Sequence, residues 1–215
     1  MTYAVKEMFY TLQGEGAHAG TPAVFVRLAG CNLWSGREED RERDAAKGVC
    51  ARWCDTDFRG TDGVNGGRYE AAALARAAVS LWPTPSGIKT VVITGGEPTL
   101  QLDAALVDAI HEIGFRVHVE TNGTGHVPSS VDWITVSPKP PAGPRLQRYD
   151  EVKSVLCEGH NVEQWAHLAP LCYLQPLWSA DAAARSENLQ QCIRYVMNHP
   201  HWRLSLQTHK MVGLP

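Results

Sequence analysis

Apolar and β-branched residues recur in short runs along the chain, and longer amphipathic segments lie between several of these runs. Short runs of this composition are typical of buried strands. Apolar residues that recur every three to four positions are typical of helices that pack one face on a sheet. The pattern predicts helices at about 68–81, 102–113 and 181–198, and strands at 23–29, 90–94, 115–119, 132–136, 151–156, 171–174 and 202–207.

The alternation of predicted strands and helices favours an α/β fold with a mostly parallel sheet and the helices outside it. No internal repeat or long linker interrupts the pattern, so we expect residues 1–215 to form a single domain. Polar motifs follow the strands, where the active sites of β/α barrels collect. These motifs are CNLW after the first strand, TGGEP after the second, ETNG at 120–123, SPK at 137–139, QP at 175–176 and QTHK at 207–210.

Charge and hydropathy argue against several classes of protein. The net charge is −3 at pH 7 and no block of Lys and Arg occurs, which argues against a nucleic-acid partner. No apolar run approaches the roughly 18–20 residues that span a bilayer, which argues against a membrane protein. The first ten residues lack the basic start and apolar core of an export signal, so the six cysteines predict reduced thiols in the cytoplasm.

Three cysteines are the main candidates for chemistry. Cys31 and Cys50 are separated by eighteen residues, and Cys50 and Cys54 by three. Three thiolates can hold a four-iron cluster while one iron keeps an open position for a substrate or cofactor. The charged segment 35–48 between them predicts an exposed, partly helical excursion. A zinc site completed by His18 or Asp55 is an alternative.

The other three cysteines, Cys157, Cys172 and Cys192, lie in apolar contexts that are typical of inert buried thiols.

The TGGEP motif offers a different kind of site. Its two glycines allow a ligand to approach the backbone at a strand end, and Glu97 offers an anionic acceptor for an ammonium group. The alternative is that this motif is only a tight loop.

The motifs GCNLW, CARWCDT and TGGEP together resemble the radical S-adenosylmethionine superfamily. The resemblance becomes more specific with YTLQGEG at 10–16, CDTDF at 54–58, ETNG, VSPK, the Glu151-x-Lys153 pair, Gln175-Pro176 and QTHK. Taken over essentially the whole chain, these motifs are similar to the 7-carboxy-7-deazaguanine synthase family. Two departures stand out: the superfamily usually spaces its cysteines by three and two residues, whereas this chain has eighteen and three.

The resemblance implies a partial β/α barrel with an extended cluster-binding loop at about 31–54. It also implies that Cys31, Cys50 and Cys54 hold a [4Fe-4S] cluster, and that the open iron chelates S-adenosylmethionine, whose reductive cleavage starts radical chemistry. The cofactor itself supplies such chemistry, while the protein orients it. The implied cofactor contacts are Trp53, Cys54, Asp55, Gly96, Glu97, Glu120, Ser137, Pro138, Lys139, Gln175, Pro176, Leu177 and Trp178; for Trp53 an ordinary core position is the alternative.

The implied reaction is the ring contraction of 6-carboxy-5,6,7,8-tetrahydropterin to 7-carboxy-7-deazaguanine with loss of ammonia, in the biosynthesis of queuosine-type deazapurines. Thr56 matches a magnesium ligand, and one protein hydroxyl is sufficient for Mg²⁺. The family resemblance also implies a homodimer and a flavodoxin-like or other low-potential electron donor. The implied substrate contacts are Leu12, Gln13, Gly14, Glu15, Arg27, Thr94, His209 and Pro215.

Three of these substrate contacts have specific chemical roles or alternatives. Arg27 lies inside an apolar strand, so it needs a partner, either the substrate carboxylate or a structural ion pair for which Glu15 is the candidate. His209 either donates to the substrate or is a satisfied core histidine. We expect the chain end to fold over the substrate, with the α-carboxylate of Pro215 accepting hydrogen bonds from the pterin amine edge.

Two competing functions remain open at this point. A glycyl-radical activating enzyme shares the cysteine triad and GGEP, but it acts on a protein and does not require QGEG, Arg27 or QTHK. A zinc-stabilised binding module is the non-enzymatic alternative. Iron and sulfide content separates the zinc module from both enzymes, and product formation from the carboxypterin separates the two enzymes.

Overall fold

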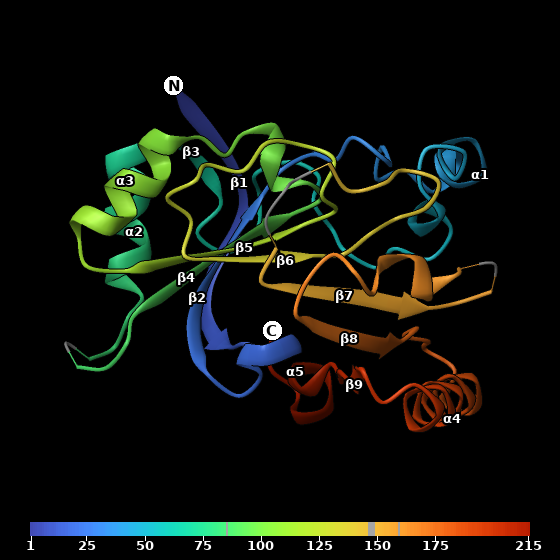
Figure 1. Ribbon diagram of the computed structural model, residues 1–215. Helices are drawn as coiled ribbons and strands as arrows, with labels where there is room; N and C mark the ends of the chain where they lie inside the picture. Colours follow the sequence, from blue (N-terminus) through green and yellow to red (C-terminus); the bar gives the residue numbers. More distant parts are fainter. Residues whose placement is uncertain (85, 146–148, 159) are drawn as a thin grey trace.

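The computed structural model describes residues 1–84, 86–145, 149–158 and 160–215. Within these residues the strands form one open, mostly parallel sheet in the order β3-β1-β2-β4-β5-β6-β7-β8-β9 (Figure 1). The strands are β1 (Thr2–Leu12), β2 (Pro22–Leu28), β3 (Gly67–Glu70), β4 (Thr90–Gly95), β5 (Arg116–Thr121), β6 (Trp133–Val136), β7 (Glu151–Leu156), β8 (Leu171–Pro176) and β9 (Trp202–Leu204).

Five α-helices and five short 3₁₀ turns connect these strands within the described residues. None of these helices is both long and apolar enough to cross a bilayer. The helices are α1 (Arg41–Asp44), α2 (Ala71–Ser80), α3 (Ala104–Glu112), α4 (Ala182–Asn198) and α5 (Thr208–Val212), and the 3₁₀ turns are η1 (Gly16–His18), η2 (Glu38–Asp40), η3 (Val49–Arg52), η4 (Pro98–Leu100) and η5 (Val162–Trp165).

The seven predicted strands and three predicted helices are confirmed, as is the partial barrel with mostly parallel strands. Two strands were not predicted. β1 runs antiparallel to β2, and β3 runs antiparallel to β1. The predicted helix 68–81 was wrong at its start, because Arg68–Glu70 belong to β3 and the helix begins at Ala71.

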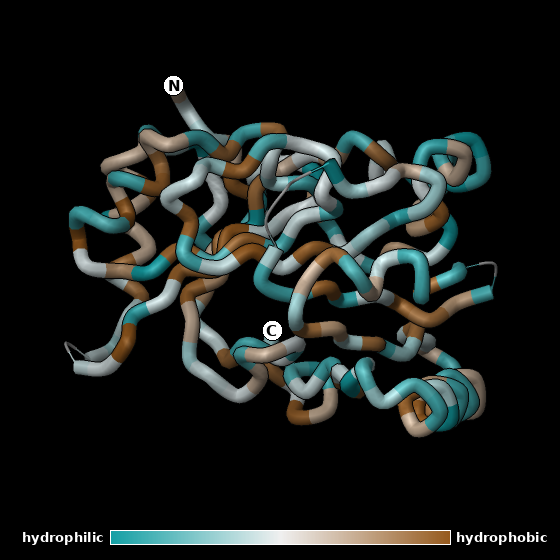
Figure 2. Tube along the Cα trace, viewed as in Figure 1, coloured by the Kyte–Doolittle hydropathy of each residue, from teal (hydrophilic) through white to brown (hydrophobic). Residues whose placement is uncertain are grey.

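The two faces of the sheet differ in chemistry because successive side chains of a strand point to opposite faces. On one face, buried apolar side chains of β2, β4 and β5 pack against α2 and α3, and Figure 2 shows hydrophobic positions gathered along these central strands. Alternate positions on the other face carry polar side chains, such as Arg27 on β2 opposite Thr94 on β4. Polar chemistry is thereby collected on the concave side of the sheet.

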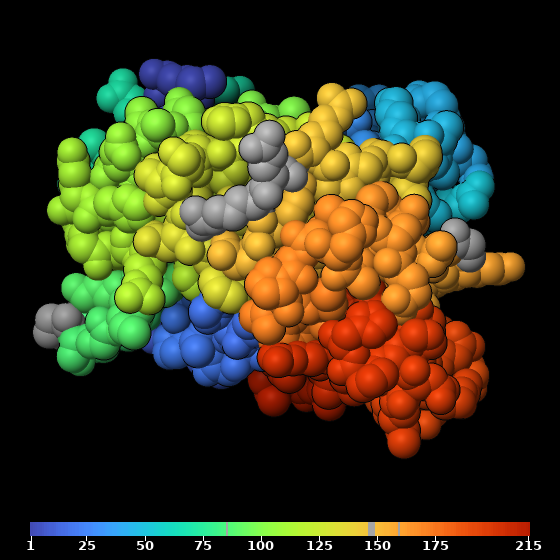
Figure 3. All heavy atoms as spheres, in the orientation of Figure 1, coloured from blue at the N-terminus to red at the C-terminus, as the bar shows by residue number. Residues whose placement is uncertain are grey.

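Residues 31–54 form a separate lobe at one corner of the molecule, beside the carboxyl ends of the strands (Figures 1 and 3). The segment contains η2, α1 and η3, so the expected partly helical excursion is present. The buried carboxylate of Asp44 accepts the N–H of Ser35 at 2.9 Å and the ammonium of Lys47 at 3.0 Å. Hydrogen bonds from Arg43 and Lys47 lower the pKa of Asp44 to about 2, so the lobe is organised around a carboxylate anion.

Candidate active site

Two adjoining cavities open at the carboxyl ends of the strands. The first, which we call the polar cavity, has a volume of about 360 Å³ and lies between the end of β1, β2 and the C-terminal residues. The second, the cysteine cavity, has a volume of about 190 Å³ and is lined by Cys31, Cys50 and Cys54. Because they share a wall, a group bound in one cavity can reach a group bound in the other. Both are lined by Glu15, Asp55, Thr56, Thr94, Gly95, Glu120 and Gln207.

The residues that the sequence assigns to substrate all lie on the wall of the polar cavity, and Thr56 joins them. Most residues assigned to the cofactor line the cysteine cavity. The substrate set is Leu12, Gln13, Gly14, Glu15, Arg27, Thr94, His209 and Pro215, and the cofactor set on the wall is Trp53, Cys54, Asp55, Gly96, Glu120, Ser137, Lys139 and Gln175.

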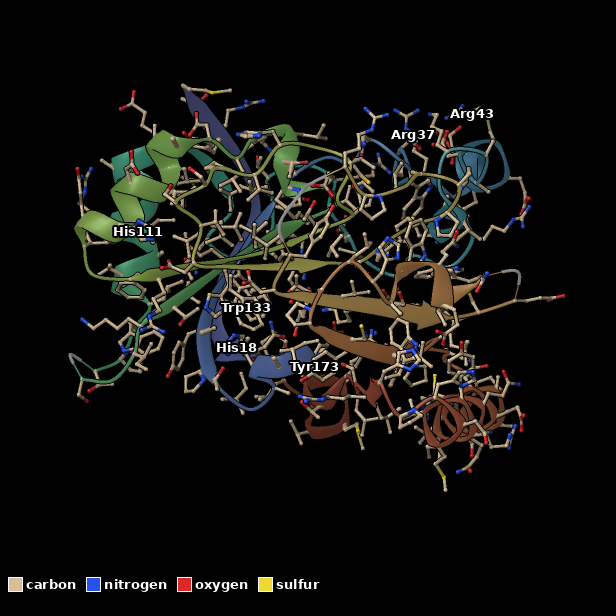
Figure 4. All side chains as sticks on the ribbon, in the orientation of Figure 1. His18, Arg37, Arg43, His111, Trp133 and Tyr173 are labelled. Carbon is tan, nitrogen blue, oxygen red and sulfur yellow. The ribbon has the colours of Figure 1, made fainter. Side chains whose placement is uncertain are left out.

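The three thiols suit an iron–sulfur cluster. Burial raises the pKa of Cys31, and it raises that of Cys50 to about 11, so these two thiols are protonated when free and release protons when metal binds. An all-sulfur donor set around one cavity favours iron–sulfur chemistry. Among the described residues, no group of three His, Cys, Asp or Glu side chains is arranged to hold a metal ion. The ring centre of His18 lies 4.5 Å from those of His118 and Trp133, and Figure 4 shows His18 beside Trp133.

The inserted segment holds the cysteine loop through one arginine. The Arg41 guanidinium donates to the carbonyl of Ala51 at 2.7 Å and to that of Cys54 at 3.2 and 3.3 Å. The same guanidinium lies 4.4 Å from the centre of the Trp34 ring. Trp34, Ala51 and Phe58 form a small buried core against which Cys31 and Cys54 pack. The helix in the expanded gap thus braces the cysteine loop from outside.

Glu97 is not on the cavity wall. Its carboxylate is fully buried and accepts hydrogen bonds from the Thr99 N–H and hydroxyl, the Thr121 hydroxyl and the Asn122 N–H, at 2.5–3.0 Å. The chain itself therefore already donates three hydrogen bonds to Oε1 and one to Oε2 of the carboxylate that the sequence assigns to a ligand ammonium. This carboxylate instead ties the TGGEP turn to the ETNG turn.

The glycines of TGGEP are required by the chain as well as by any ligand. A Cβ at Gly96 would lie 2.4 Å from the carbonyl oxygen of Gly30 and 2.7 Å from the Cβ of Cys31. A Cβ at Gly95 would lie 2.3 Å from the carbonyl oxygen of Leu28. The end of β4 can therefore approach the turn that presents Cys31 only without side chains.

A buried lysine lies where the two cavities meet. Lys153 on β7 donates to Glu15 and, at 2.8 Å, to Glu120, and it is 4% exposed. Gln13 donates to the other oxygen of Glu120 at 2.8 Å, and Gln207 donates to Glu15 at 2.9 Å. Burial raises the pKa of Glu15, but the charge of Lys153 and its hydrogen bond outweigh burial and lower it to about 2. Both cavities therefore contain fixed anionic acceptors.

Sequence reasoning noted Lys153 only as part of a motif and gave it no role. The signal was available, because a charged residue in the apolar run EVKSVL must find a partner when the strand is buried. The neighbouring Glu151 also contacts the QGEG loop, which contains Glu15. It accepts the N–H of Ala17 at 2.8 Å, and a Cβ at Gly16 would lie 2.3 Å from its Oε1. β7 thus holds the QGEG loop in place.

Arg27 pairs with a residue that the sequence did not suggest. Its Nε donates to Oε1 of Glu7 at 2.7 Å, and the two residues are direct neighbours in the β1–β2 register. The suggested partner Glu15 was wrong, because Glu15 pairs with Lys153. Arg27 and Glu7 both line the polar cavity, so this ion pair forms part of its wall.

Besides Glu97, four residues assigned to the cofactor lie elsewhere than on the wall of the cysteine cavity. Pro138 is buried, and Pro176, Leu177 and Trp178 line a separate hollow beside α4 and α5. The Trp178 ring lies between the Arg185 guanidinium at 4.9 Å and the Lys210 ammonium at 4.6 Å. Lys210 also binds Asp55 at 2.6 Å, which joins this hollow to the shared wall.

The C-terminal residues lie over the polar cavity. Thr208 donates through its N–H and its hydroxyl to the Gly14 carbonyl, each at 3.0 Å. A Cβ at Gly14 would lie 2.0 Å from Nδ1 of His209, so only glycine fits here. The Thr11 hydroxyl donates to the Pro215 carbonyl oxygen at 3.3 Å. QTHK therefore packs on the QGEG loop.

An open parallel sheet with a three-thiol cavity at its carboxyl edge defines the class of radical S-adenosylmethionine enzymes. The chain is 51% identical to the 7-carboxy-7-deazaguanine synthase of Burkholderia multivorans, with both chains covered completely. It is 48% identical to the synthase of Nitratidesulfovibrio vulgaris, again over both full lengths. The crystal structure of QueE from Escherichia coli matches with a TM-score of 0.68 and 28% identity, over 96% of this chain and 94% of that one.

The chain therefore belongs to the 7-carboxy-7-deazaguanine synthase family. No protein-family model matches it.

Proposed function

We propose that the two joined cavities convert 6-carboxy-5,6,7,8-tetrahydropterin to 7-carboxy-7-deazaguanine with release of ammonia, as a lyase of queuosine-type deazapurine biosynthesis. One observation carries this assignment. The polar cavity, whose wall contains every residue assigned to the pterin, adjoins a cavity lined by three thiols. A glycyl-radical activating enzyme acts on a protein and needs no polar cavity of this kind for a small substrate.

Cys31, Cys50 and Cys54 would hold the [4Fe-4S] cluster, with S-adenosylmethionine along the same cavity. When bound, this pair supplies hydrogen-atom abstraction at the substrate C6. The chain supplies orientation. Glu120 offers acceptor oxygens for ribose hydroxyls, and Lys139, held by a 2.7 Å hydrogen bond to Ser137, offers a cation at the cavity wall.

In the polar cavity, Glu15 and Arg27 provide complementary charges for the two ends of the pterin. The Glu15 carboxylate accepts from the donor edge of the ring, and the Arg27 guanidinium faces the carboxylate of the substrate. His209 borders the same space, and burial lowers its pKa, which favours a neutral imidazole that can donate one hydrogen bond. The C-terminal residues that pack on Gly14 form one side of this cavity.

Magnesium belongs to this proposal through Thr56, which lines both cavities. A hydroxyl at the shared wall could hold the ion beside the substrate carboxylate, while waters and ligand oxygens complete its shell. Asp55, the adjacent carboxylate, is already engaged by Lys210 at 2.6 Å.

The proposal also covers the catalytic domain, the oligomeric state and the electron donor. Residues 1–215 act as one catalytic domain in which 31–54 is the cluster loop, and two copies form a homodimer. A flavodoxin-like or other low-potential protein donates the electron. All six cysteines are free thiols, which suits the cytoplasm.

Anaerobic reconstitution tests the proposal. Purified protein should contain four irons and four sulfides per chain and should form the deazaguanine product from the carboxypterin, detected by mass spectrometry. Cys31→Ala, Cys50→Ala and Cys54→Ala should each lose the cluster and activity, whereas Cys157→Ala and Cys192→Ala should retain both. Zinc in place of iron, or a full cluster in Cys50→Ala, would contradict the assignment.

A further inference from the structure

The ammonium of Lys153 is the structural link between the two cavities. It reaches across β6, from β7 to Glu120 on β5, and at the same time to Glu15 in the loop that follows β1. Glu15 and Glu120 both line both cavities, and Lys153 lines the cysteine cavity. One buried cation thus fixes the two carboxylates that face substrate and cofactor.

We propose that Lys153 is a positioning residue that couples binding of the pterin to binding of S-adenosylmethionine, through its bridge between Glu15 and Glu120. The inference rests on the proposed function of the two cavities. A ligand that withdraws charge from Glu15 changes how strongly Lys153 holds Glu120, and the reverse is also true. Thermodynamic coupling of this kind is reciprocal, so each ligand must alter the affinity of the other by the same factor.

The surrounding hydrogen bonds fix the geometry of the bridge between Glu15, Lys153 and Glu120. Gln13 holds the second oxygen of Glu120 at 2.8 Å, while Gln175 and Gln207 hold the second oxygen of Glu15 at 3.3 and 2.9 Å. These amide hydrogen bonds fix the orientation in which each carboxylate binds Lys153. Without the ammonium, two buried carboxylates would face each other, one would take up a proton, and neither would keep its position.

The chain contains a matched control. Lys6 on β1 also pairs with two carboxylates, Asp57 and Asp62, each at 2.8 Å, and its side chain is 10% exposed against 5% for Lys153. Lys6 lines neither cavity. Lys6→Met therefore removes a lysine that pairs with two carboxylates and leaves the bridge untouched; its partners are exposed, and one of them, Asp57, lines the polar cavity.

The test is the dissociation constant of S-adenosylmethionine, measured by anaerobic calorimetry on cluster-loaded protein with and without saturating carboxypterin. In the wild type the pterin should change this constant by a factor of about 5 to 150. Lys153→Met should bring the factor close to one, and Lys6→Met should leave it unchanged. Wild-type coupling in a folded, cluster-loaded Lys153→Met, or loss of coupling in Lys6→Met, would overturn the inference.

A second variant covers the case in which Lys153→Met does not fold. Glu120→Gln leaves the ion pair between Lys153 and Glu15 in place. It weakens the contact of Lys153 with residue 120, on the cofactor side, so it should also reduce the coupling factor. Full coupling in Glu120→Gln would overturn the inference. Failure of the proposed function has a different signature, since the wild type would then bind S-adenosylmethionine but neither bind nor convert the carboxypterin.

Discussion

Oε2 of Glu97 accepts the backbone N–H of Asn122 at 2.7 Å and so joins the end of β4 to the end of β5. Oε1 of the same carboxylate accepts the hydroxyl of Thr121 at 2.6 Å. All groups around Glu97 are donors, and the side chain is fully buried. The glutamate of the GGE motif therefore holds together the two turns at the rim of the cysteine cavity, and it does so from a buried position.

Glu97→Gln should lower the stability of the protein. The amide NH₂ would face a donor N–H or hydroxyl, and a buried donor left without an acceptor costs about 1–3 kcal/mol. Thermal unfolding of the metal-free chain should show a lower Tm, with Glu42→Gln, an exposed position in the lobe, as the control. A variant with the wild-type Tm that no longer binds S-adenosylmethionine would instead assign Glu97 to the ligand.

The predicted strand ends and the observed rim agree because parallel strands bring their carboxyl ends to one edge, whatever their order in the sequence. The pairing inside the rim could not be predicted in this way. Arg27 meets Glu7 because of the register between β1 and β2, and β1 was missed since its run carries charges at Lys6 and Glu7. The donors around Glu97 come from two separate turns, so no local pattern in the sequence shows that this carboxylate is satisfied.

Arg27→Ala should weaken binding of the carboxypterin while S-adenosylmethionine binds normally. The Arg27 side chain is partly exposed, and a hydrogen bond to a charged group contributes about 1.5–3 kcal/mol, which corresponds to roughly a tenfold to hundredfold rise in the Michaelis constant. Glu7→Gln separates the two roles of this arginine, since it removes the structural pair and leaves the guanidinium. If Glu7→Gln and Arg27→Ala lose stability equally and both keep the wild-type Michaelis constant, the arginine is structural only.

Thr56→Ala should reduce the response of turnover to magnesium. The variant removes one hydroxyl at the shared wall, and Mg²⁺ with few protein ligands depends strongly on each of them. Activity is measured over a magnesium titration in metal-free buffer, with Thr56→Ser expected to behave as the wild type. An unchanged titration curve in Thr56→Ala would mean that the ion has other ligands.

Arg41→Ala should loosen the cluster loop. The variant loses the hydrogen bonds to Ala51 and Cys54 and the stacking on Trp34, while the three thiols remain. Iron content after reconstitution should fall, and the iron should be lost faster to a chelator than in the wild type. Arg52→Ala is the control, because Arg52 makes an exposed pair with Glu42. Equal chelation rates in all three proteins would show that Arg41 does not brace the loop.

Mild acid should destabilise the protein through His118, whose ring centre lies 4.5 Å from that of His18 and 6.2 Å from that of Trp133. Burial, followed by the charge of His18, lowers the pKa of His118 to about 4, against roughly 6.5 in an unfolded chain. Between these values the unfolded state binds the extra proton, so stability is full above pH 6.5 and falls as the pH falls.

The loss should amount to about 2 kcal/mol between pH 7 and pH 5. Chemical denaturation of the metal-free chain at a series of pH values measures it, and His118→Gln removes the titrating group. Asp132 and Arg116, which act electrostatically on His118, are unchanged in that variant, so the difference between the two pH profiles isolates the imidazole. Parallel profiles for wild type and His118→Gln would show that the loss in acid comes from other groups.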